Sequence, residues 1–282
     1  AFFTYVSCLI STLILQFTNV PSEPGTGSTR PDAGTPFDSQ ESGRVLEQLI
    51  ARGDARLEQR AWDTPERTGE PRIFYVAAKH LTWNDLSEQA EVVGDGELVI
   101  RDPDGDGDED DRKDRGLFKG PGTSRFVWTR RLDMTRDADG GFDLSMEGAV
   151  EGIYRGSTKQ DIASITAERI EARTRPTGEP RTQPQPNPND GVLDLGGDMD
   201  IDRLMARGQV YIATPRRRVD CDLFDYDVGT GLAKVNAADG RTVSILTEGS
   251  PTPVRAGSVL WNMDPAIDTI AITEARGGAI NP

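Results

Sequence analysis

Apolar and polar residues alternate through long stretches of the chain, with the period of two that is typical of a β-strand with one buried face. The clearest stretch runs from Phe142 to Val150, where Phe, Leu, Met, Gly and Val alternate with Asp, Ser, Glu and Ala. The same alternation occurs within residues 97–101, 206–212 and 268–272. We therefore predict an all-β protein whose strands turn their apolar faces towards a shared interior.

A second pattern recurs at longer intervals: an aromatic residue is followed by Asn or Asp, then by a polar turn and another alternating run. It occurs at Trp83-Asn84, Tyr226-Asp227 and Trp261-Asn262, and a related version begins at Phe126. A strand, a turn and a strand, repeated, indicate stacked β-hairpins rather than a catalytic domain.

Three glycines lie at similar places in these runs. Gly94, Gly148 and Gly208 each stand a residue or two before an apolar β run. A glycine inside a strand marks a bulge or a sharp bend. We therefore expect the hairpins to be bent at one common level, so that the sheet folds over on itself.

The N-terminal part differs from the rest. Residues 1–20 are uncharged and largely apolar, and they are long enough to be a membrane anchor or the remnant of a signal sequence. The alternative is a strand or helix that packs on an upstream domain, because the chain begins with Ala and we expect a fragment or a processed product. Residues 21–43 are rich in Pro, Gly and Ser and predict a flexible linker. The apolar residues within 44–67 have near-helical spacing, which predicts a short amphipathic helix.

A proline-rich polar segment, 173–199, separates a first β block (68–172) from a second β block (200–282). This composition is typical of an extended linker or a long loop. Both blocks have the same pattern, so a linker between blocks and an insertion within one continuous stack both stay open.

Composition excludes several classes of protein. The chain has 282 residues and a net charge of −15, so it repels a phosphate backbone and we expect no nucleic-acid partner. Two cysteines far apart in sequence and a single histidine, His80, argue against a disulfide framework and a Cys/His zinc site. The sequence contains no Gly-x-Ser-x-Gly, P-loop or dinucleotide-binding motif, and we expect that it is not an enzyme.

One acidic segment has the spacing of a calcium loop. Its carboxylates are Asp102, Asp104, Asp106, Asp108 and Asp110. With Gly107 they match the start of an EF-hand loop, but Lys113 stands where that motif has a bidentate Glu, and the flanks look like strands. A calcium site in a hairpin loop and a solvated acidic loop both stay open, and calcium is the one cofactor the sequence suggests.

The segment 205–235 resembles the OstA-like repeat of the Lpt-type periplasmic lipopolysaccharide-transport proteins. The matching residues are Gly208-Gln209-Val210, Asp222, Tyr226-Asp227, Thr230-Gly231 and Ala233. Residues 77–102 repeat the scheme, and 146–172 look like a further piece of it. The Asp-rich segment and the proline-rich segment depart from the family pattern.

The resemblance implies a bent antiparallel β-jellyroll of stacked hairpins in the periplasm of a double-membraned bacterium. It implies an apolar interior that holds the acyl chains of lipopolysaccharide or a related glycolipid. It also implies edge strands that pair end to end with other OstA-like domains to form a bridge. Residues 1–20 would supply the inner-membrane anchor found in one type of member.

We expect acyl chains to contact the apolar residues of the alternating runs. The lipid-facing candidates are Leu98, Ile100, Leu144, Met146, Val150, Val210, Ile212, Ile270 and Ile272. The alternative is that these residues pack a closed core and that the protein is an exported scaffold, stiffened by calcium, without lipid cargo. The arginines 216–218 form either a solvated turn or a contact with headgroup phosphates.

Overall fold

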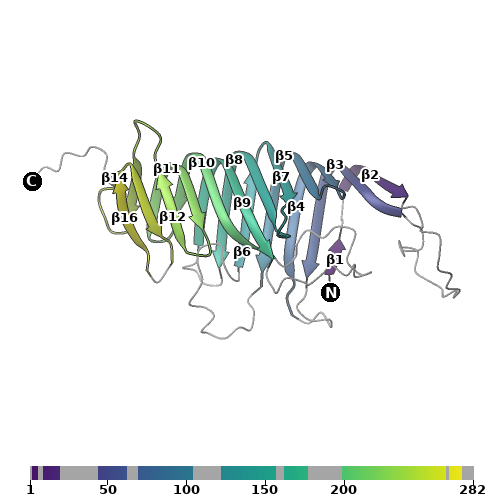
Figure 1. The fold of residues 1–282 in the computed structure, drawn as a ribbon, viewed down its shortest axis with the longest axis horizontal. Coiled ribbons are helices and arrows are strands. Elements are labelled where there is room, and N and C mark those ends of the chain that lie inside the picture. The colour runs from purple at the N-terminus through teal and green to yellow at the C-terminus, as the bar shows by residue number, and fades with distance from the viewer. Residues whose placement is uncertain are drawn as a thin grey trace, which may run out of the picture.

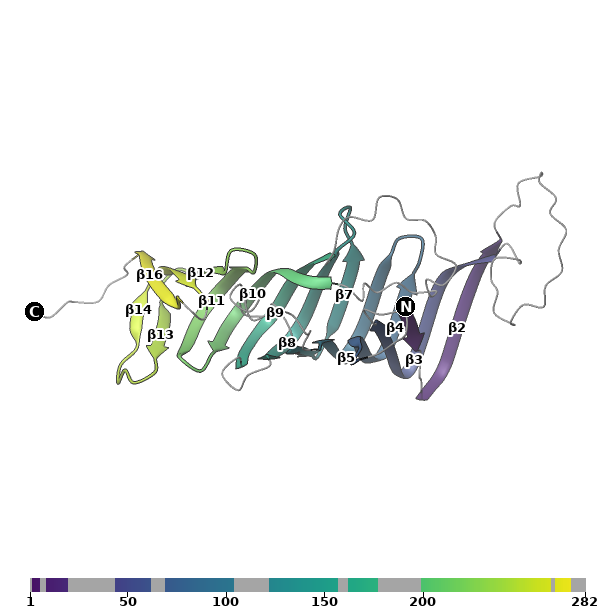
Figure 2. The ribbon, with the colours of Figure 1, turned by 90° about the horizontal axis from the view of Figure 1, so that it is seen from below.

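The computed structural model describes residues 2–5, 9–19, 44–61, 69–103, 122–156, 162–176, 199–264 and 267–274. In this part of the chain every regular element is a β-strand, and the strands form one antiparallel sheet of sixteen. Figures 1 and 2 show them side by side along the long axis, from β2 at one end to β14 and β16 at the other. The prediction of an all-β protein is confirmed.

The strands, in chain order, are β1 (Phe2–Tyr5), β2 (Leu9–Asn19), β3 (Arg44–Ala61), β4 (Arg72–Asn84), β5 (Gln89–Asp102), β6 (Gly122–Trp128), β7 (Arg131–Arg136), β8 (Phe142–Gly156), β9 (Ile162–Pro176), β10 (Met199–Ala213), β11 (Arg217–Asp227), β12 (Leu232–Asn236), β13 (Val243–Thr247), β14 (Val254–Ala256), β15 (Ser258–Asn262) and β16 (Thr269–Glu274).

Long strands make the sheet fold over into two walls. One half of β5 pairs with β7 and the other half with β6, and β8 divides its two halves between the same partners. β3 and β11 are divided in the same way, between β2 and β1 and between β12 and β13. The first wall consists of β2, β7, β12, β15, β16 and the halves of the long strands that continue the sheet beside them. The second wall consists of β1, β6, β13, β14 and the other halves of the long strands.

The two walls meet along a row of glycine bends, as the sequence predicted. Gly94, Gly148 and Gly208 have φ of 91°, 84° and 76°, and Gly53 in β3 has φ of 100°. Strand register shifts beside each of them, for example between Glu147 and Val150 of β8. These positions form the bend. The hairpin turns lie on the opposite side, where the two walls end, and this side is called the mouth.

The core lies between the walls and is continuous along the molecule. Its buried side chains form one cluster that extends from Leu49 in β3 to Met263 beyond β15. Along β8 the inward residues are buried on both sides of the bend. Burying a large apolar side chain contributes about 1.5–3 kcal/mol, so contact between the walls is the main source of stability.

The helix predicted within 44–67 is wrong, because residues 44–61 form β3. The buried side chains Leu49, Ala51, Ala55 and Leu57 follow a period of two on either side of Gly53. The helix was inferred from the spacing of Val45, Leu46, Leu49, Ile50 and Leu57. Of these, Leu49 and Leu57 lie on the buried face of β3, whereas Ile50, next to Leu49, is only half-buried. β3 pairs with both β2 and β4, and this pairing outweighs local propensity.

Other segment boundaries also follow from the pairing. The described parts of residues 1–20 are strands β1 and β2, which pair with β3. No helix in the described part of the chain is long and apolar enough to cross a membrane. β9 extends to Pro176 and pairs directly with β10, so residues 173–176 belong to a strand and the sheet is continuous from the first β block to the second. The linker 21–43 and residues 177–198 lie outside the described residues.

Candidate functional site

Most of the lipid-facing candidates lie in the core between the walls. Leu98, Leu144, Met146, Val150, Val210 and Ile212 are all at most 4% exposed. Ile100 and Ile270 are partly buried and pack against this core. In the structure these residues belong to, or pack against, one buried cluster between the walls, and burial by protein is what the scaffold alternative expects.

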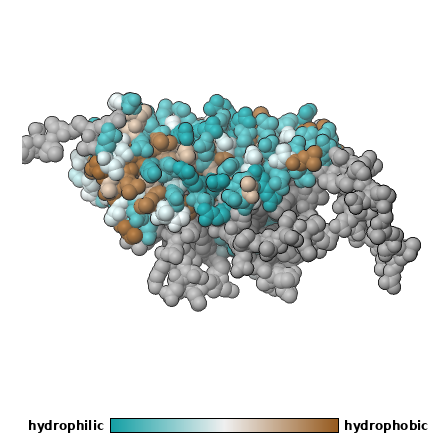
Figure 3. All heavy atoms as spheres, viewed as in Figure 1, coloured by the Kyte–Doolittle hydropathy of each residue, from teal (hydrophilic) through white to brown (hydrophobic). Residues whose placement is uncertain are grey.

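The interior ends in apolar residues at the C-terminal end of the molecule. Ile272 of β16 lies opposite the buried Val259, and Val254 of β14 lies opposite the buried Ile245. Residues directly opposite in a sheet share a face, so Ile272 and Val254 belong to the inner faces. They are nevertheless 51% and 49% exposed, because β14 and β16 are the outermost strands at this end among the described residues. Figure 3 shows apolar residues gathered at this end.

Two aromatic rings fill the inner face of the second wall. A Cβ on Gly96 would lie 2.3 Å from the ring of Trp128, and a Cβ on Gly152 would lie 2.8 Å from the ring of Phe126. Each ring therefore occupies the space where the glycine directly opposite it on the neighbouring strand has no side chain. The indole N–H of Trp128 is buried and has no hydrogen-bond partner among the described residues. The interior thus contains a hydrogen-bond donor that an acceptor on a bound molecule could use.

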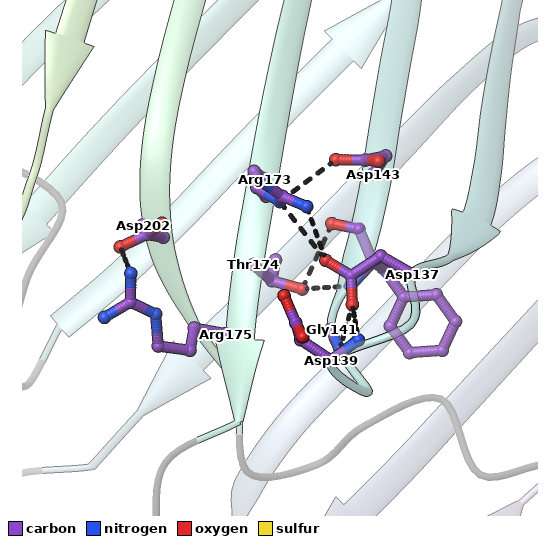
Figure 4. Close-up of polar contacts among 9 residues, drawn as sticks. Asp137, Asp139, Gly141, Asp143, Arg173, Thr174, Arg175 and Asp202 are labelled. Atoms are coloured by element: carbon purple, nitrogen blue, oxygen red, sulfur yellow. Dashed lines mark hydrogen bonds and ion pairs between the residues drawn. The ribbon is translucent and has the colours of Figure 1, made fainter.

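The outer face of the first wall is covered by ion pairs, and Figure 4 shows the group at the mouth. Asp137 accepts hydrogen bonds from the backbone N–H groups of Asp139 and Gly141, both at 2.9 Å. Its other oxygen accepts two bonds from the Arg173 guanidinium, at 3.1 and 3.2 Å. The hydrogen bond to Asp137 and the charge of Asp143 raise the pKa of Arg173.

This group fastens the β7–β8 turn to β9 and is not a receptor for anions. The cationic head of Arg173 faces three carboxylates, and Arg175 pairs with Asp202 at 2.6 Å. Similar pairs continue along the outer face, such as Arg203 with Asp225. A phosphate at this surface would have to compete with carboxylates already in place.

One ion pair joins the two walls across the mouth. Arg217 begins β11 in the second wall, and Asp268 ends the turn before β16 in the first wall. Arg217 donates from Nε to Asp268 Oδ1 at 2.8 Å, from Nη2 to the Asp268 carbonyl oxygen at 2.7 Å, and from Nη1 to Thr247 Oγ1 at 3.1 Å. The Trp261 indole N–H also donates to Asp268 Oδ1, at 3.0 Å.

Two interpretations of residues 216–218, a solvated turn and a contact with headgroup phosphates, follow from the sequence, and the structure places the three arginines differently from one another. Arg216 and Arg218 are exposed. Arg217 points inward, because alternation along β11 places it on the same face as the buried Val219 and Cys221. Alternation could have identified this orientation, but the partner Asp268 lies 51 residues away in the chain and follows only from the folded arrangement.

The acidic segment is described only at its beginning. Asp102 ends β5 and pairs with Arg72 at 3.0 Å. Asp104, Asp106, Asp108 and Asp110 lie outside the described residues. Within the described ranges, no group of three or more His, Cys, Asp or Glu side chains is placed to hold a metal ion, and the calcium reading stays a prediction.

Two further side chains, Cys221 and His80, are of types that can act as a nucleophile or a base. Cys221 is buried, and burial, followed by the nearby charges of Asp222 and Asp220, raises its pKa to about 12. Its thiol therefore stays protonated at neutral pH and is a poor nucleophile. His80 lies on β4 at the bend, opposite Arg52 and Val93.

Comparison of the chain with models of known protein families gave no match, and comparison with curated proteins gave none either.

Proposed function

We propose that this protein binds lipopolysaccharide-like glycolipid in the periplasm and passes it along the interior of its folded sheet, without catalysis. The observation that carries the proposal is the continuous apolar interior, which extends from Leu49 to Met263 and ends in the exposed Ile272 and Val254. In this proposal the sheet is a β-jellyroll of the OstA-like type, and acyl chains lie between its walls.

Both ends of the sheet suit end-to-end assembly. β16 is the last strand of the first wall, and β2 lies at the opposite end, with Ile14 and Leu15 exposed. Edge strands offer unpaired backbone groups to a strand of another protein. A second OstA-like domain that pairs with β16 would cover Ile272 and would extend the interior into its own.

Acyl chains have to replace contacts that the walls now make with each other. Burying one methylene contributes about 0.8 kcal/mol, so a chain of a dozen carbons contributes on the order of 10 kcal/mol. That is comparable with the burial of several core side chains, at about 1.5–3 kcal/mol each. The indole N–H of Trp128, which has no hydrogen-bond partner among the described residues, also supports lipid binding, because an ester or amide carbonyl of a glycolipid can accept a hydrogen bond from it.

Site-specific photocrosslinking tests this proposal on the whole chain in a lipopolysaccharide-producing host. A photoreactive residue replaces Met146, whose side chain is buried in the interior, or Glu147, the next residue, whose side chain pairs with Arg169 on the outer face. We expect glycolipid adducts at position 146 and none at position 147. Trp128→Phe, which removes the donor and keeps the ring, should lower the yield at 146. Equal yields at both positions would refute an interior site.

A second candidate is a scaffold that assembles through the same edges and carries no lipid. The closed core favours it, because Met146, Ile170 and Leu204 are 0% exposed and their contacts are already satisfied by protein. Native mass spectrometry of the purified chain separates the two candidates. Bound glycolipid supports the carrier, whereas lipid-free oligomers that ignore added lipopolysaccharide support the scaffold.

A further inference from the structure

The C-terminal end of the interior is built differently from its middle. Between β3 and β11 the long strands β3, β4, β5, β8, β9, β10 and β11 cross the bend and belong to both walls, whereas β6 and β7 each lie in one wall and are joined across the bend by residues 129–130. Beyond β11 the first wall continues as β12, β15 and β16, and the second wall as β13 and β14. There the chain crosses the bend through the turn 237–242 and through Gly257.

The Arg217–Asp268 pair lies where this end of the interior reaches the mouth. The bend joins the walls on one side, and Arg217 joins them on the other side. Arg217 is 15% exposed and Asp268 is 14% exposed, whereas Arg203 on the outer face is 52% exposed. An ion pair that is largely shielded from water is screened less and is stronger than an exposed pair.

The backbone of Asp268 has an unfavourable conformation that its surroundings maintain. Its φ is 38°, in the left-handed region that non-glycine residues rarely adopt. The backbone N–H of Asp268 donates to the Asp264 carbonyl at 2.8 Å. The turn therefore aims both the carboxylate and the backbone carbonyl of residue 268 at the same guanidinium.

We propose that Arg217 and Asp268 form a clasp that holds the mouth closed at the C-terminal end, and that breaking the clasp lets the terminal parts of the two walls move apart. The clasp would control access at the end where Ile272 and Val254 are exposed. The nature of the guest that enters there rests on the proposed function, but the opening itself does not depend on any guest.

Hydrogen exchange of the whole chain without lipid tests the clasp. Arg217→Gln removes the charge and the fork of donors. A hydrogen bond to a charged group contributes about 1.5–3 kcal/mol, so we expect amide exchange in β13 to β16 to become about ten- to hundredfold faster. Exchange in β4 and β5 should not change, because both strands cross the bend and lie far from β11 in the order of the sheet.

The chain provides a matched control one residue away. Arg218→Gln makes the same substitution at an exposed position on the outer face of β11, and we expect exchange like that of the wild type. Arg217→Lys keeps the charge and loses the planar fork, so it should be intermediate, and it remains informative if Arg217→Gln does not fold.

Two results would overturn the clasp. One is wild-type exchange in β13 to β16 of the Arg217→Gln variant. The other is faster exchange by the same factor in all strands, which would mean that Arg217 supports the whole fold. Photocrosslinking to lipid is a separate readout. Faster exchange without lipid adducts would support the clasp and contradict the carrier function. Lipid adducts with unchanged exchange would support the carrier function and contradict the clasp.

Discussion

Replacing Gly148 by Ala tests whether the bend depends on glycine. Gly148 lies in β8 with φ of 84°, a conformation that costs a residue with a side chain roughly 1–2 kcal/mol. A Cβ there would lie 2.7 Å from Arg130 Cγ and 2.8 Å from Thr129 Oγ1. Thr129 is held in place, because its hydroxyl donates to the Gly148 carbonyl at 2.7 Å.

The two costs can be separated by a second glycine. Gly240 has φ of 78° and no atom within 4 Å of an added Cβ, so Gly240→Ala measures the backbone cost alone, roughly 1–2 kcal/mol. At Gly148 the close contacts add a cost of the kind seen in overpacked cores, about 1–3 kcal/mol. We expect Gly148→Ala to lower the free energy of unfolding by about 2–5 kcal/mol in total.

Urea unfolding followed by circular dichroism gives both values under the same conditions. A larger loss for Gly148→Ala than for Gly240→Ala is the expected result. If the two variants lose the same amount, the crowding at the bend has no energetic consequence and the common bend level is not set by these glycines. A changed slope with urea would instead indicate a change in the surface exposed on unfolding.

Further predictions concern the core, the buried thiol and a turn. Gly96→Ala places a Cβ 2.3 Å from the Trp128 ring, so we expect a loss of roughly 3 kcal/mol or more in urea unfolding, and Trp128→Leu in the same chain should recover part of it. Cys221, with its pKa raised to about 12, should resist iodoacetamide at pH 8 in the folded chain and react in denaturant, as followed by mass spectrometry. The hydrogen bond from the Thr230 backbone N–H lowers the pKa of Asp227. Its carboxylate therefore stabilises the fold above the unfolded pKa of about 3.9, and this contribution disappears as the pH falls through the lower folded pKa. The stability difference between wild type and Asp227→Asn should accordingly be largest at neutral pH and shrink in acid.

The strands and the bend could be read from the sequence because both are local signals. Alternation along Phe142 to Val150 predicted the buried face of β8, and Gly94, Gly148 and Gly208 predicted the bend. The same local signal misled at residues 44–61. There the near-helical spacing of Leu49, Ile50 and Leu57 suggested a helix, and nothing within the segment shows that strands pair with it on both sides.

The site depends on contacts between residues far apart in the chain, and the alternation of apolar and polar residues does not predict such contacts. The face of Ile272 was predictable, but its exposure follows from β16 being the last strand of its wall. The inward direction of Arg217 was likewise predictable from Val219 and Cys221, but its pairing with Asp268 depends on which turns meet across the mouth. A sequence pattern assigns residues to faces, and only the folded sheet determines which faces and turns meet.

A closed core and a carrier are compatible only if the walls can separate without unfolding, and the hydrogen bonds of this sheet permit that. The ladders of β12, β15 and β16 run within the first wall, and the ladder of β13 and β14 runs within the second. Moving the terminal parts of the walls apart therefore costs side-chain contacts and the Arg217–Asp268 pair, while these ladders stay intact. In the middle of the molecule, where β8 to β10 cross the bend as single strands, the same movement would have to distort the backbone at Gly148 and Gly208. If a guest enters this protein, entry at the C-terminal end therefore requires less disruption than entry in the middle, and apolar residues of the inner faces are already exposed at that end.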